Sequence, residues 1–242
     1  MLELHAVPGL PEIRPGDDLA ALLAGAGEWR ATDVLCIAHK VVSKAEGRIV
    51  SLADVTPGEQ AVVMAAEHGK DPRALEVVLS EAAEVVRADA GRIICRTRHG
   101  FVCANAGVDA SNAGDADTLI LLPLDPDASA RALRAALPGH PAVVITDSFG
   151  RAWRAGQCEI AIGIAGLRPL EDWRGLPDAE GREMHATVIA IADEAAAAAD
   201  LVRGKATGEP AVRLRGLGRF VLEDDGPGAA ALLRAKEQDL FG

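Results

Sequence analysis

The sequence predicts a mixed α/β fold (α+β mixed) and not a regular doubly wound sheet. Of its 242 residues, 49% are hydrophobic, which is typical of a globular chain with a sizeable core. Short apolar runs of strand length lie between segments with helical spacing, but the two kinds do not alternate regularly. No G-x-G-x-x-G follows a predicted strand and no G-x-x-x-x-G-K-[ST] occurs, which argues against a Rossmann or P-loop fold.

Strands are predicted where short runs rich in Val, Ile and Leu are bounded by polar residues or glycine. Residues 92–97 and 100–105 should pair through a tight connection at Arg98 and His99. Residues 141–149 form an apolar run that ends on polar side chains, and Gly150 should then turn the chain. The complete set of expected strands is 33–38, 92–97, 100–105, 118–124, 141–149, 159–166, 211–217 and 219–223.

Helices are predicted from capping signals and apolar spacing. Residues 56–59 (TPGE) have capping-box spacing with Pro at the first helical position, so a helix should begin there and end near Gly69. Asp71, followed by Pro, repeats this start signal for a helix through 73–86. The other expected helices are 19–27 (capped by Asp17), 128–137, 186–202 and 228–240.

Charge and composition exclude several classes of function. The chain has 25 Lys and Arg against 36 Asp and Glu, a net charge of −11, and 3% aromatic residues, which argues against nucleic acid as a partner. No apolar run reaches the roughly 18 residues of a membrane span, and the first residues lack the pattern of a signal peptide. We therefore expect a cytoplasmic protein. Its four cysteines, which form no C-x-x-C pair, should be reduced and mostly buried: Cys36, Cys95, Cys103 and Cys158.

The common short catalytic motifs are absent, so the site must be assembled from separate loops. There is no H-E-x-x-H, paired C-x-x-C or G-x-S-x-G. Scarce residue types, however, gather in a few segments. Two of the five Lys lie in 39–48, and both Asn lie in 100–112. This clustering indicates that the Lys and Asn side chains of these segments have a chemical role.

Residues 100–112 are the first candidate segment. A strand leads to Asp109, Ser111 and Asn112. Asp is a hard oxygen ligand suited to Mg²⁺ or Mn²⁺, and Asn can bond a phosphate or a base. The alternative is an Asx-type turn in which Asp109 and Asn112 bond the local backbone.

Residues 143–157 are the second candidate. An apolar strand carries Asp147 and Ser148 at its carboxyl end, where α/β sheets usually bind ligands. Arg151 and Arg154 follow, and their guanidinium groups suit anionic oxygens. The alternative is a strand-end turn with solvated arginines.

Three further segments are weaker candidates. Residues 39–48 carry Lys40 and Lys44, which suit phosphate, although a polar strand edge is the alternative. Residues 201–210 contain glycines that let the backbone approach a ligand, although a helix C-cap with Gly204 just past the last turn is the commoner explanation. Residues 9–18 form a rigid Gly- and Pro-containing loop that by itself indicates only a connection.

Charge links the first two segments. If Asp109 and Asp147 meet beside a phosphate, like charges about 4 Å apart repel by about 4 kcal/mol at an effective dielectric of about 20. The net charge of −11 makes an anionic ligand still less favourable. A divalent cation between carboxylates and phosphates removes this conflict, so phosphate use would nearly require a metal.

Taken together and in order, these segments resemble the GTP-dependent γ-glutamyl ligases that complete coenzyme F420. The resemblance covers nearly the whole chain. It rests on GLPEIRPGDDL, HKVVSKAEGR, GFVCANAGVDASN, TDSFGRAWRAGQ, ADEAAAAADLVRGK and AVRLRGL. It implies a family-specific two-domain fold in an intertwined homodimer. We expect one ligase domain over 1–242 with two subdomains, for which 167–182 is a candidate boundary, and no C-terminal reductase domain.

The resemblance also implies a reaction. GTP phosphorylates the terminal carboxylate of the coenzyme precursor F420-0, and the amine of L-glutamate attacks the resulting acyl phosphate. Further glutamates are then added through γ-links. Mg²⁺ or Mn²⁺ is the implied metal, and K⁺ is an additional candidate ion. The implied partners are small molecules and a second copy of the chain.

The family's functional residues transfer by motif onto this sequence. The implied metal ligands are Asp109, Asp147 and Ser148, and the implied catalytic residues are Asp109, Asp147 and Lys44. The implied GTP contacts are Leu10, Pro11, Glu12, Ile13, His39, Lys40, Lys44 and Asn112. The loop expected to close over the nucleotide is Arg203, Gly204, Lys205, Ala206, Thr207 and Gly208.

One position departs from the family. Some members carry Gln where this chain has Lys205 and use it near the metal. Because a protonated Lys cannot ligate a cation, we expect Lys205 to meet phosphate instead. Two other functions use the same residue types: a metal-dependent nucleotide phosphohydrolase and a non-catalytic nucleotide-binding module.

Overall fold

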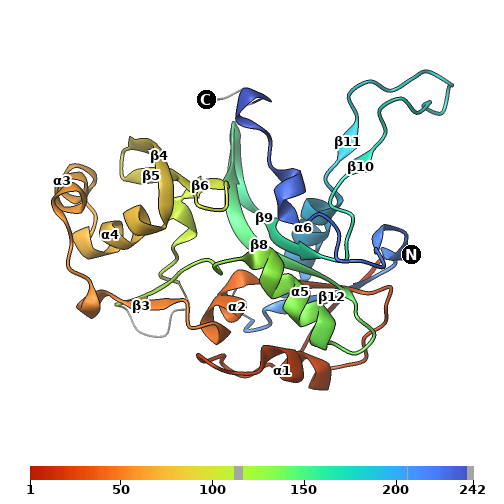
Figure 1. Ribbon diagram of the computed structural model, residues 1–242, viewed down its shortest axis with the longest axis horizontal. Coiled ribbons are helices and arrows are strands. Elements are labelled where there is room, and N and C mark those ends of the chain that lie inside the picture. The colour runs from red at the N-terminus through yellow and green to blue at the C-terminus, as the bar shows by residue number, and fades with distance from the viewer. Residues whose placement is uncertain (112–116, 206, 239–242) are drawn as a thin grey trace.

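The computed structural model describes residues 1–111, 117–205 and 207–238 (Figure 1). It confirms a mixed α/β fold. The largest sheet has five strands in the order β1-β12-β2-β8-β9. These strands are Glu3–Ala6 (β1), Ala211–Arg215 (β12), Val34–Ala38 (β2), Ala142–Arg151 (β8) and Arg154–Ala165 (β9).

One strand pair of this sheet is parallel, and it prepares the site. β2 and β8 run side by side in register from Val34 opposite Ala142 to Ala38 opposite Thr146, whereas the other pairs of this sheet are antiparallel. Both strands are buried apolar runs, as expected for the centre of a sheet covered on two faces. The parallel pairing ends at Ala38 opposite Thr146, where the polar segment 39–48 follows β2 and the polar residues 146–148 continue within β8.

Helices cover the sheet on both sides. In Figure 1, α5 (Pro126–Ala136) crosses in front of it and α6 (Ile191–Arg203) lies behind it, and both pack against β9. The buried face of α6 is built from small residues such as Ala195, Ala196 and Ala199, which let the helix lie close to the strands. Helix α1 (Leu19–Gly25) contacts α5 at the lower edge.

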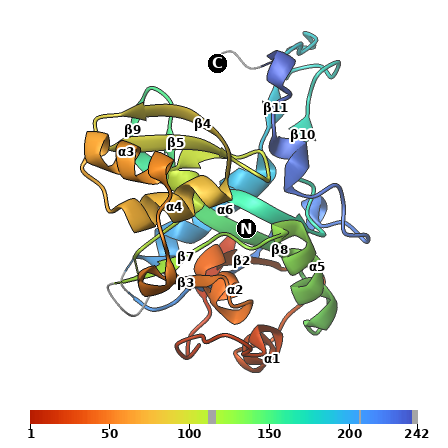
Figure 2. The same ribbon diagram turned by 60° about the vertical axis from the view of Figure 1, so that its left-hand side comes forward.

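A second group of elements has its own small core. Helices α3 (Glu59–His68) and α4 (Pro72–Glu81) lie beside a sheet of β4 (Ala82–Asp89), β5 (Arg92–Thr97) and β6 (Val102–Ala104), as Figure 2 shows. Its buried residues are Ala61, Ala65, Leu75, Val78, Ile93, Cys95 and Ala106.

The remaining elements connect these groups or project from them. β3 (Ile49–Ser51) pairs with β7 (Thr118–Ile120). β10 (Glu171–Asp172) and β11 (Val188–Ile189) form an arm that projects from the body in Figure 1. Within the described ranges there are also five short 3-10 helices: Leu52–Asp54, Asn105–Gly107, Gly218–Phe220, Ala229–Leu232 and Lys236–Gln238.

Local signals predicted several boundaries correctly. Helix α3 ends at Gly69, which has a left-handed φ of 65°, and Asp71 caps α4 by accepting a hydrogen bond from the amide of Arg73. The predicted hairpin of β5 and β6 is present, and its register places Cys95 opposite Cys103. All four cysteines are free thiols, of which three are buried and Cys158 is half-buried. No helix among the described residues has the length and apolarity that a membrane crossing needs.

Several local predictions are wrong. The helix expected to begin at 56–59 with a capping box begins at Glu59, after Gly58, and its start has no side-chain cap. Asp18 caps α1, because Asp17 instead accepts a hydrogen bond from the amide of Arg14. Residues 82–89 leave the helix and form β4, because pairing with β5 satisfies their backbone. The segment 39–48 is no strand edge, because His39–Ala45 forms helix α2.

Other predicted elements are shorter or displaced. Gly150 does not turn the chain, since β8 continues to Arg151 and the turn lies at Ala152 and Trp153, where Trp153 has φ 62°. Residues 219–223 form a 3-10 turn and an isolated bridge instead of a strand, and 228–238 form two 3-10 turns instead of a helix. The predicted helix 186–202 begins at Ile191, because 188–189 pair with β10.

Close packing of β9 against α5 gives a prediction for stability. A Cβ atom at Gly163 would lie 2.4 Å from the carbonyl oxygen of Pro126, which belongs to the backbone and cannot move aside easily. We expect Gly163→Ala to lower the free energy of unfolding by about 1–3 kcal/mol in urea titrations. Gly150→Ala is the matched control, because nothing lies within 4 Å of a Cβ there. Equal stability of the two variants would contradict this packing.

Candidate active site

His39 and Asp147 lie together where the parallel pairing of β2 and β8 ends. Asp147 and Ser148 are inside β8, which continues to Arg151, and not at the carboxyl end of a strand as predicted, because pairing with β9 extends the strand. His39 is buried at the start of α2, and its Nε2 atom lies 3.4 Å from Oδ1 of Asp147. Its Nδ1 atom is 3.3 Å from the hydroxyl of Ser43, one turn further along the helix. Nε2 is buried and forms no hydrogen bond with any residue that the structure describes, so a polar atom of His39 remains available beside the carboxylate.

Asp109 reaches the same region from the segment after β6. Its backbone pairs with Ile120, and its Oδ2 atom lies 2.7 Å from Nζ of Lys40, the second residue of α2. Its Oδ1 atom accepts a hydrogen bond of 2.6 Å from the amide of Ser111. The Asx-type turn considered as an alternative is therefore present, together with a charged partner. Burial raises the pKa of Asp109, but the hydrogen bonds and charge of Lys40 and Ser111 outweigh it, so this pKa is below its ordinary value.

Ser148 belongs to a network that the sequence did not reveal. Its hydroxyl donates a hydrogen bond to Oε1 of Glu159, which lies opposite it on β9. Nζ of Lys205 lies 2.6 Å from the same hydroxyl and 3.1 Å from Oε1 of Glu159. Arg203 Nη2 lies 2.6 Å from Oε2 of Glu159. Strand β9 and the end of α6 thus hold Ser148 between an acid and an amine.

The carboxylate of Glu159 is buried yet ionised. Burial raises its pKa, but the charge of Arg203 and hydrogen bonds from Ser148 and Thr146 lower it to about 2. Arg203 is itself buried and also donates to Thr146 at 3.2 Å. This pair ties α6 to β8 and β9 just behind the predicted metal ligands.

A third ion pair joins the N-terminal loop to α2. Nζ of Lys44 contacts Oε1 of Glu12, and Lys44 is buried whereas the carboxylate of Glu12 is exposed. Ile13 beside it is part of the main core, which fixes the loop in place.

Most of the predicted site residues line one cavity of about 310 Å³. Those that line it are Pro11, Glu12, Ile13, His39, Lys40, Lys44, Asp109, Asp147, Ser148, Arg203, Gly204, Lys205 and Gly208. Leu10 packs partly buried against the core beside this lining, and Thr207 bonds the carbonyl of Arg203. Asn112 and Ala206 lie outside the described residues.

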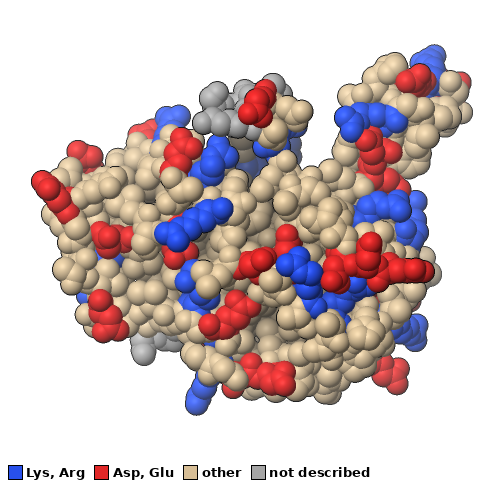
Figure 3. Space-filling model, in the orientation of Figure 1, with Lys and Arg blue, Asp and Glu red and all other residues tan. Residues whose placement is uncertain are grey.

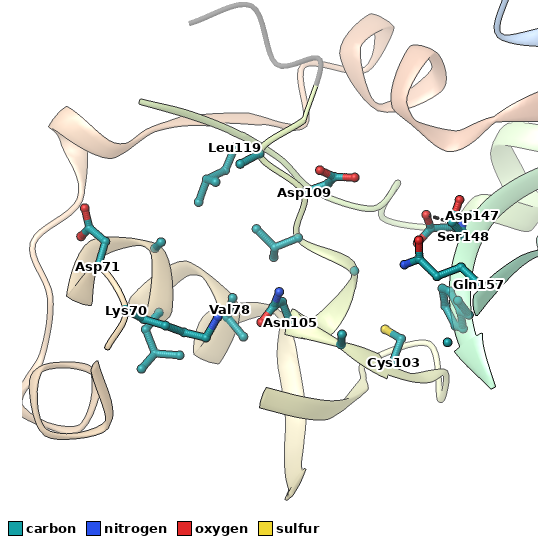
Figure 4. A pocket seen from close by; sticks show the side chains of 18 residues that line it. Lys70, Asp71, Val78, Cys103, Asn105, Asp109, Leu119, Asp147, Ser148 and Gln157 are labelled. Carbon is teal, nitrogen blue, oxygen red and sulfur yellow. Dashed lines mark hydrogen bonds between the residues drawn. The ribbon is translucent and has the colours of Figure 1, made fainter. Parts of the chain in front are cut away.

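A second cavity, of about 430 Å³, adjoins the first and shares Asp109, Asp147 and Ser148 with it. Figure 4 shows Asp147 and Ser148 on one side of this second cavity and Lys70 and Asn105 toward the other. The two carboxylates therefore lie where the cavities meet. This arrangement suits a reaction in which a group passes from one bound molecule to another.

Comparison with known proteins identifies the family. The family model for F420-0:gamma-glutamyl ligase matches residues 9–216. The coenzyme F420:L-glutamate ligase of Methanopyrus kandleri is 46% identical over 99% of this chain and 97% of its own length. The chain belongs to the F420-0:gamma-glutamyl ligase family. Proteins of the same name from Methanothermobacter thermautotrophicus and Halobacterium salinarum are 44% and 45% identical, over 99% and 98% of this chain and 98% and 94% of their own lengths.

Membership in this ligase family confirms the resemblance and the predicted class of enzyme.

Figure 3 shows Lys and Arg interspersed with Asp and Glu across the drawn face of the described residues. Two acidic residues of the network around Ser148 were not predicted from the sequence: Glu159, and Asp200, whose Oδ1 atom lies 3.4 Å from Nζ of Lys205. The available signal was an acidic residue at the start of the otherwise apolar segment 159–166.

The donor atoms of this γ-glutamyl ligase fit a divalent metal only with help from a substrate. Among the described residues, no three His, Cys, Asp or Glu side chains could hold an ion by themselves. Two carboxylates and a hydroxyl nevertheless face one cavity, and such hard oxygen donors suit Mg²⁺ or Mn²⁺. Mg²⁺ sites commonly use one or two carboxylates and complete their coordination with substrate phosphates.

Proposed function

We propose that this chain joins L-glutamate to the terminal carboxylate of coenzyme F420-0, at the expense of GTP, and adds further γ-linked glutamates. One observation carries the proposal. Residues from the N-terminal loop, α2, β8 and the end of α6 line a single cavity, and Asp109 and Asp147 lie where it meets a second one. We assign GTP to the first cavity and the coenzyme precursor to the second.

The proposed reaction has two steps. A carboxylate oxygen of the precursor attacks the γ-phosphorus of GTP, the bond from that phosphorus to the β-phosphate oxygen breaks, and GDP leaves. The amine nitrogen of glutamate then attacks the carbonyl carbon of the acyl phosphate, phosphate leaves with the bonding electrons, and the nitrogen loses a proton. Phosphorylation is needed because a carboxylate is a poor electrophile. The enzyme contributes positioning and charge neutralisation.

The chain's own residues have distinct proposed roles. Asp109, Asp147 and Ser148 would hold Mg²⁺ or Mn²⁺, which when bound neutralises charge on the transferred phosphoryl group. His39, 3.4 Å from Asp147, and Lys40, 2.7 Å from Asp109, orient these carboxylates. In this proposal Lys44, Asn112 and the loop 203–208 contact the nucleotide. The roles of Asn112 and Ala206 come from the sequence alone.

We also propose two subdomains, a homodimer, a cellular location and a monovalent ion for this chain. The buried cluster around the five-stranded sheet and the separate cluster around β5 support a division into two subdomains. The projecting β10–β11 arm, with Leu176 and Val188 exposed, supports a homodimer in which a second copy covers these side chains. A cytoplasmic location and a K⁺ requirement stay part of the proposal.

Mass spectrometry tests the proposed reaction. F420-0 incubated with GTP, glutamate and Mn²⁺ should give products heavier by successive glutamyl units, in step with GDP release. GTP alone distinguishes the alternatives. A phosphohydrolase would release phosphate without precursor and glutamate, and a non-catalytic module would bind GTP without any product.

Lys44 gives a prediction for nucleotide affinity. Because Lys44 is the buried cation of the first cavity nearest the N-terminal loop, Lys44→Gln should weaken GTP binding by about 10- to 100-fold in calorimetric titrations. Lys70→Gln removes the same charge from the second cavity and should leave GTP affinity within about twofold. Equal losses in the two variants would mean that Lys44 has no specific contact with the nucleotide.

A further inference from the structure

Three oxygen atoms from three elements surround the ammonium group of Lys205. Its Nζ atom lies 2.6 Å from the hydroxyl of Ser148 on β8, 3.1 Å from Oε1 of Glu159 on β9, and 3.4 Å from Oδ1 of Asp200 on α6. An ammonium group has three N–H donors, and here it faces three acceptors. The same set of two carboxylates and a hydroxyl is what a hard divalent cation would select.

The carboxylates beside Lys205 are sequestered from solvent, which marks the place as a cation position. Glu159 is only 3% exposed. Its Oε2 atom and Oδ1 of Asp200 are buried atoms, and Arg203 Nη2 lies 2.6 Å from the first and 3.6 Å from the second. Buried carboxylate oxygens are costly unless positive charge compensates them. Arg203 supplies part of that charge from the interior, and Lys205 supplies the rest from the cavity.

Lys205 differs from Arg203 in its exposure. The side chain of Lys205 is 66% exposed and lines the first cavity, whereas Arg203 is buried behind it. Holding a long, exposed side chain in one conformation costs entropy, so the oxygen atoms around its ammonium group must compensate that cost. Ser148, which Lys205 contacts, directly follows Asp147 in the chain. The ammonium group is therefore next to the place where the proposed metal would lie.

We propose that the ammonium group of Lys205 takes the place of a second divalent ion beside the nucleotide phosphates, so that each active site binds one divalent cation. Phosphoryl-transfer sites often hold two metal ions about 3.5–4 Å apart, which share the charge of the phosphate groups. Here the ammonium group of Lys205, which is part of the chain, supplies one of those positive charges. The inference rests on the proposed function, because it assumes that Asp109 and Asp147 bind the other cation.

Counting bound Mn²⁺ tests this inference. The full chain is titrated with Mn²⁺ at saturating GDP, and free Mn²⁺ is measured by its electron paramagnetic resonance signal. Wild type should bind one Mn²⁺ per chain beyond what GDP alone binds in a protein-free control. Lys205→Met, which removes the charge from an exposed side chain, should bind two, and Lys205→Arg, which keeps it, should bind one. Lys70→Met is the matched control and should bind one.

The outcomes separate this inference from the proposed function. Two Mn²⁺ ions in wild type would overturn the inference, and so would a single ion in a folded Lys205→Met variant. The metal role of Asp109 and Asp147 would survive either result. No bound Mn²⁺ in wild type would overturn that metal role and the inference with it. Product mass spectra from the same preparations report independently whether the ligase reaction occurs.

Discussion

Asp109→Asn should lower the rate of glutamate ligation by about 100- to 1,000-fold, which is the scale on which removal of one electrostatic contributor slows an enzyme. Asn keeps the shape of Asp but carries no charge, so it is a poor ligand for a hard cation. The same change leaves Nζ of Lys40 without the carboxylate that now lies 2.7 Å away. Steady-state rates of product formation, measured by mass spectrometry, check this prediction.

Asp172→Asn is the matched control for Asp109→Asn. Asp172 is also paired with a cation, since Arg174 Nη2 lies 2.6 Å from its carboxylate, but the pair is exposed on the projecting arm. It should keep full activity as long as the arm keeps its shape. A fully active Asp109→Asn variant would show that this carboxylate is not a metal ligand.

Arg203→Met should be the most destabilising charge removal in the site. It leaves the buried carboxylate of Glu159 without its 2.6 Å partner, and breaking a buried ion pair in this way costs about 3–5 kcal/mol. Urea unfolding at pH 7 measures the loss. Arg174→Met breaks a pair of the same length on the surface and should leave the free energy of unfolding nearly unchanged, because exposed ion pairs contribute little. Equal losses would show that burial of Glu159 does not matter.

The pH dependence of this loss has a definite sign. The pKa of Glu159 falls from an ordinary 4.5 to about 2 in the folded chain, so its ionised form stabilises the fold above pH 4.5. That contribution disappears as the pH falls from 4.5 toward 2, because protons then bind the unfolded chain first. The stability difference between wild type and Arg203→Met should therefore shrink over this range. A difference that stays constant would show that Glu159 is not the partner responsible.

Local sequence signals predicted the fold where short-range chemistry decides it. The cap at Asp71, the left-handed Gly69 and the buried strand at 33–38 need no information from distant residues. Local signals failed where pairing with a distant segment decides the secondary structure. The segment 82–89 has a helical composition but becomes β4, because β5 offers it a strand partner. The same holds for 188–189, which leave the Ala-rich helix to pair with β10.

In the candidate site, too, the residues set by local sequence could be predicted and those set by tertiary pairing could not. Asp109 follows β6, and Asp147 and Ser148 follow the apolar first half of β8, so the sequence could single them out. The parallel pairing of β2 and β8 brings His39 beside Asp147. Glu159 could not be predicted, because its role depends on the register that sets it opposite Ser148 on β9. Register depends on the whole sheet and not on the local sequence.

Crystals grown with Mn²⁺ and GTP or GDP would test the central claim most directly, through the anomalous scattering of manganese. The account predicts a peak within about 2.5 Å of carboxylate oxygens from both Asp109 and Asp147, with the nucleotide phosphates on its other side. A nucleotide bound elsewhere, or a manganese ion that touches neither carboxylate, would contradict it.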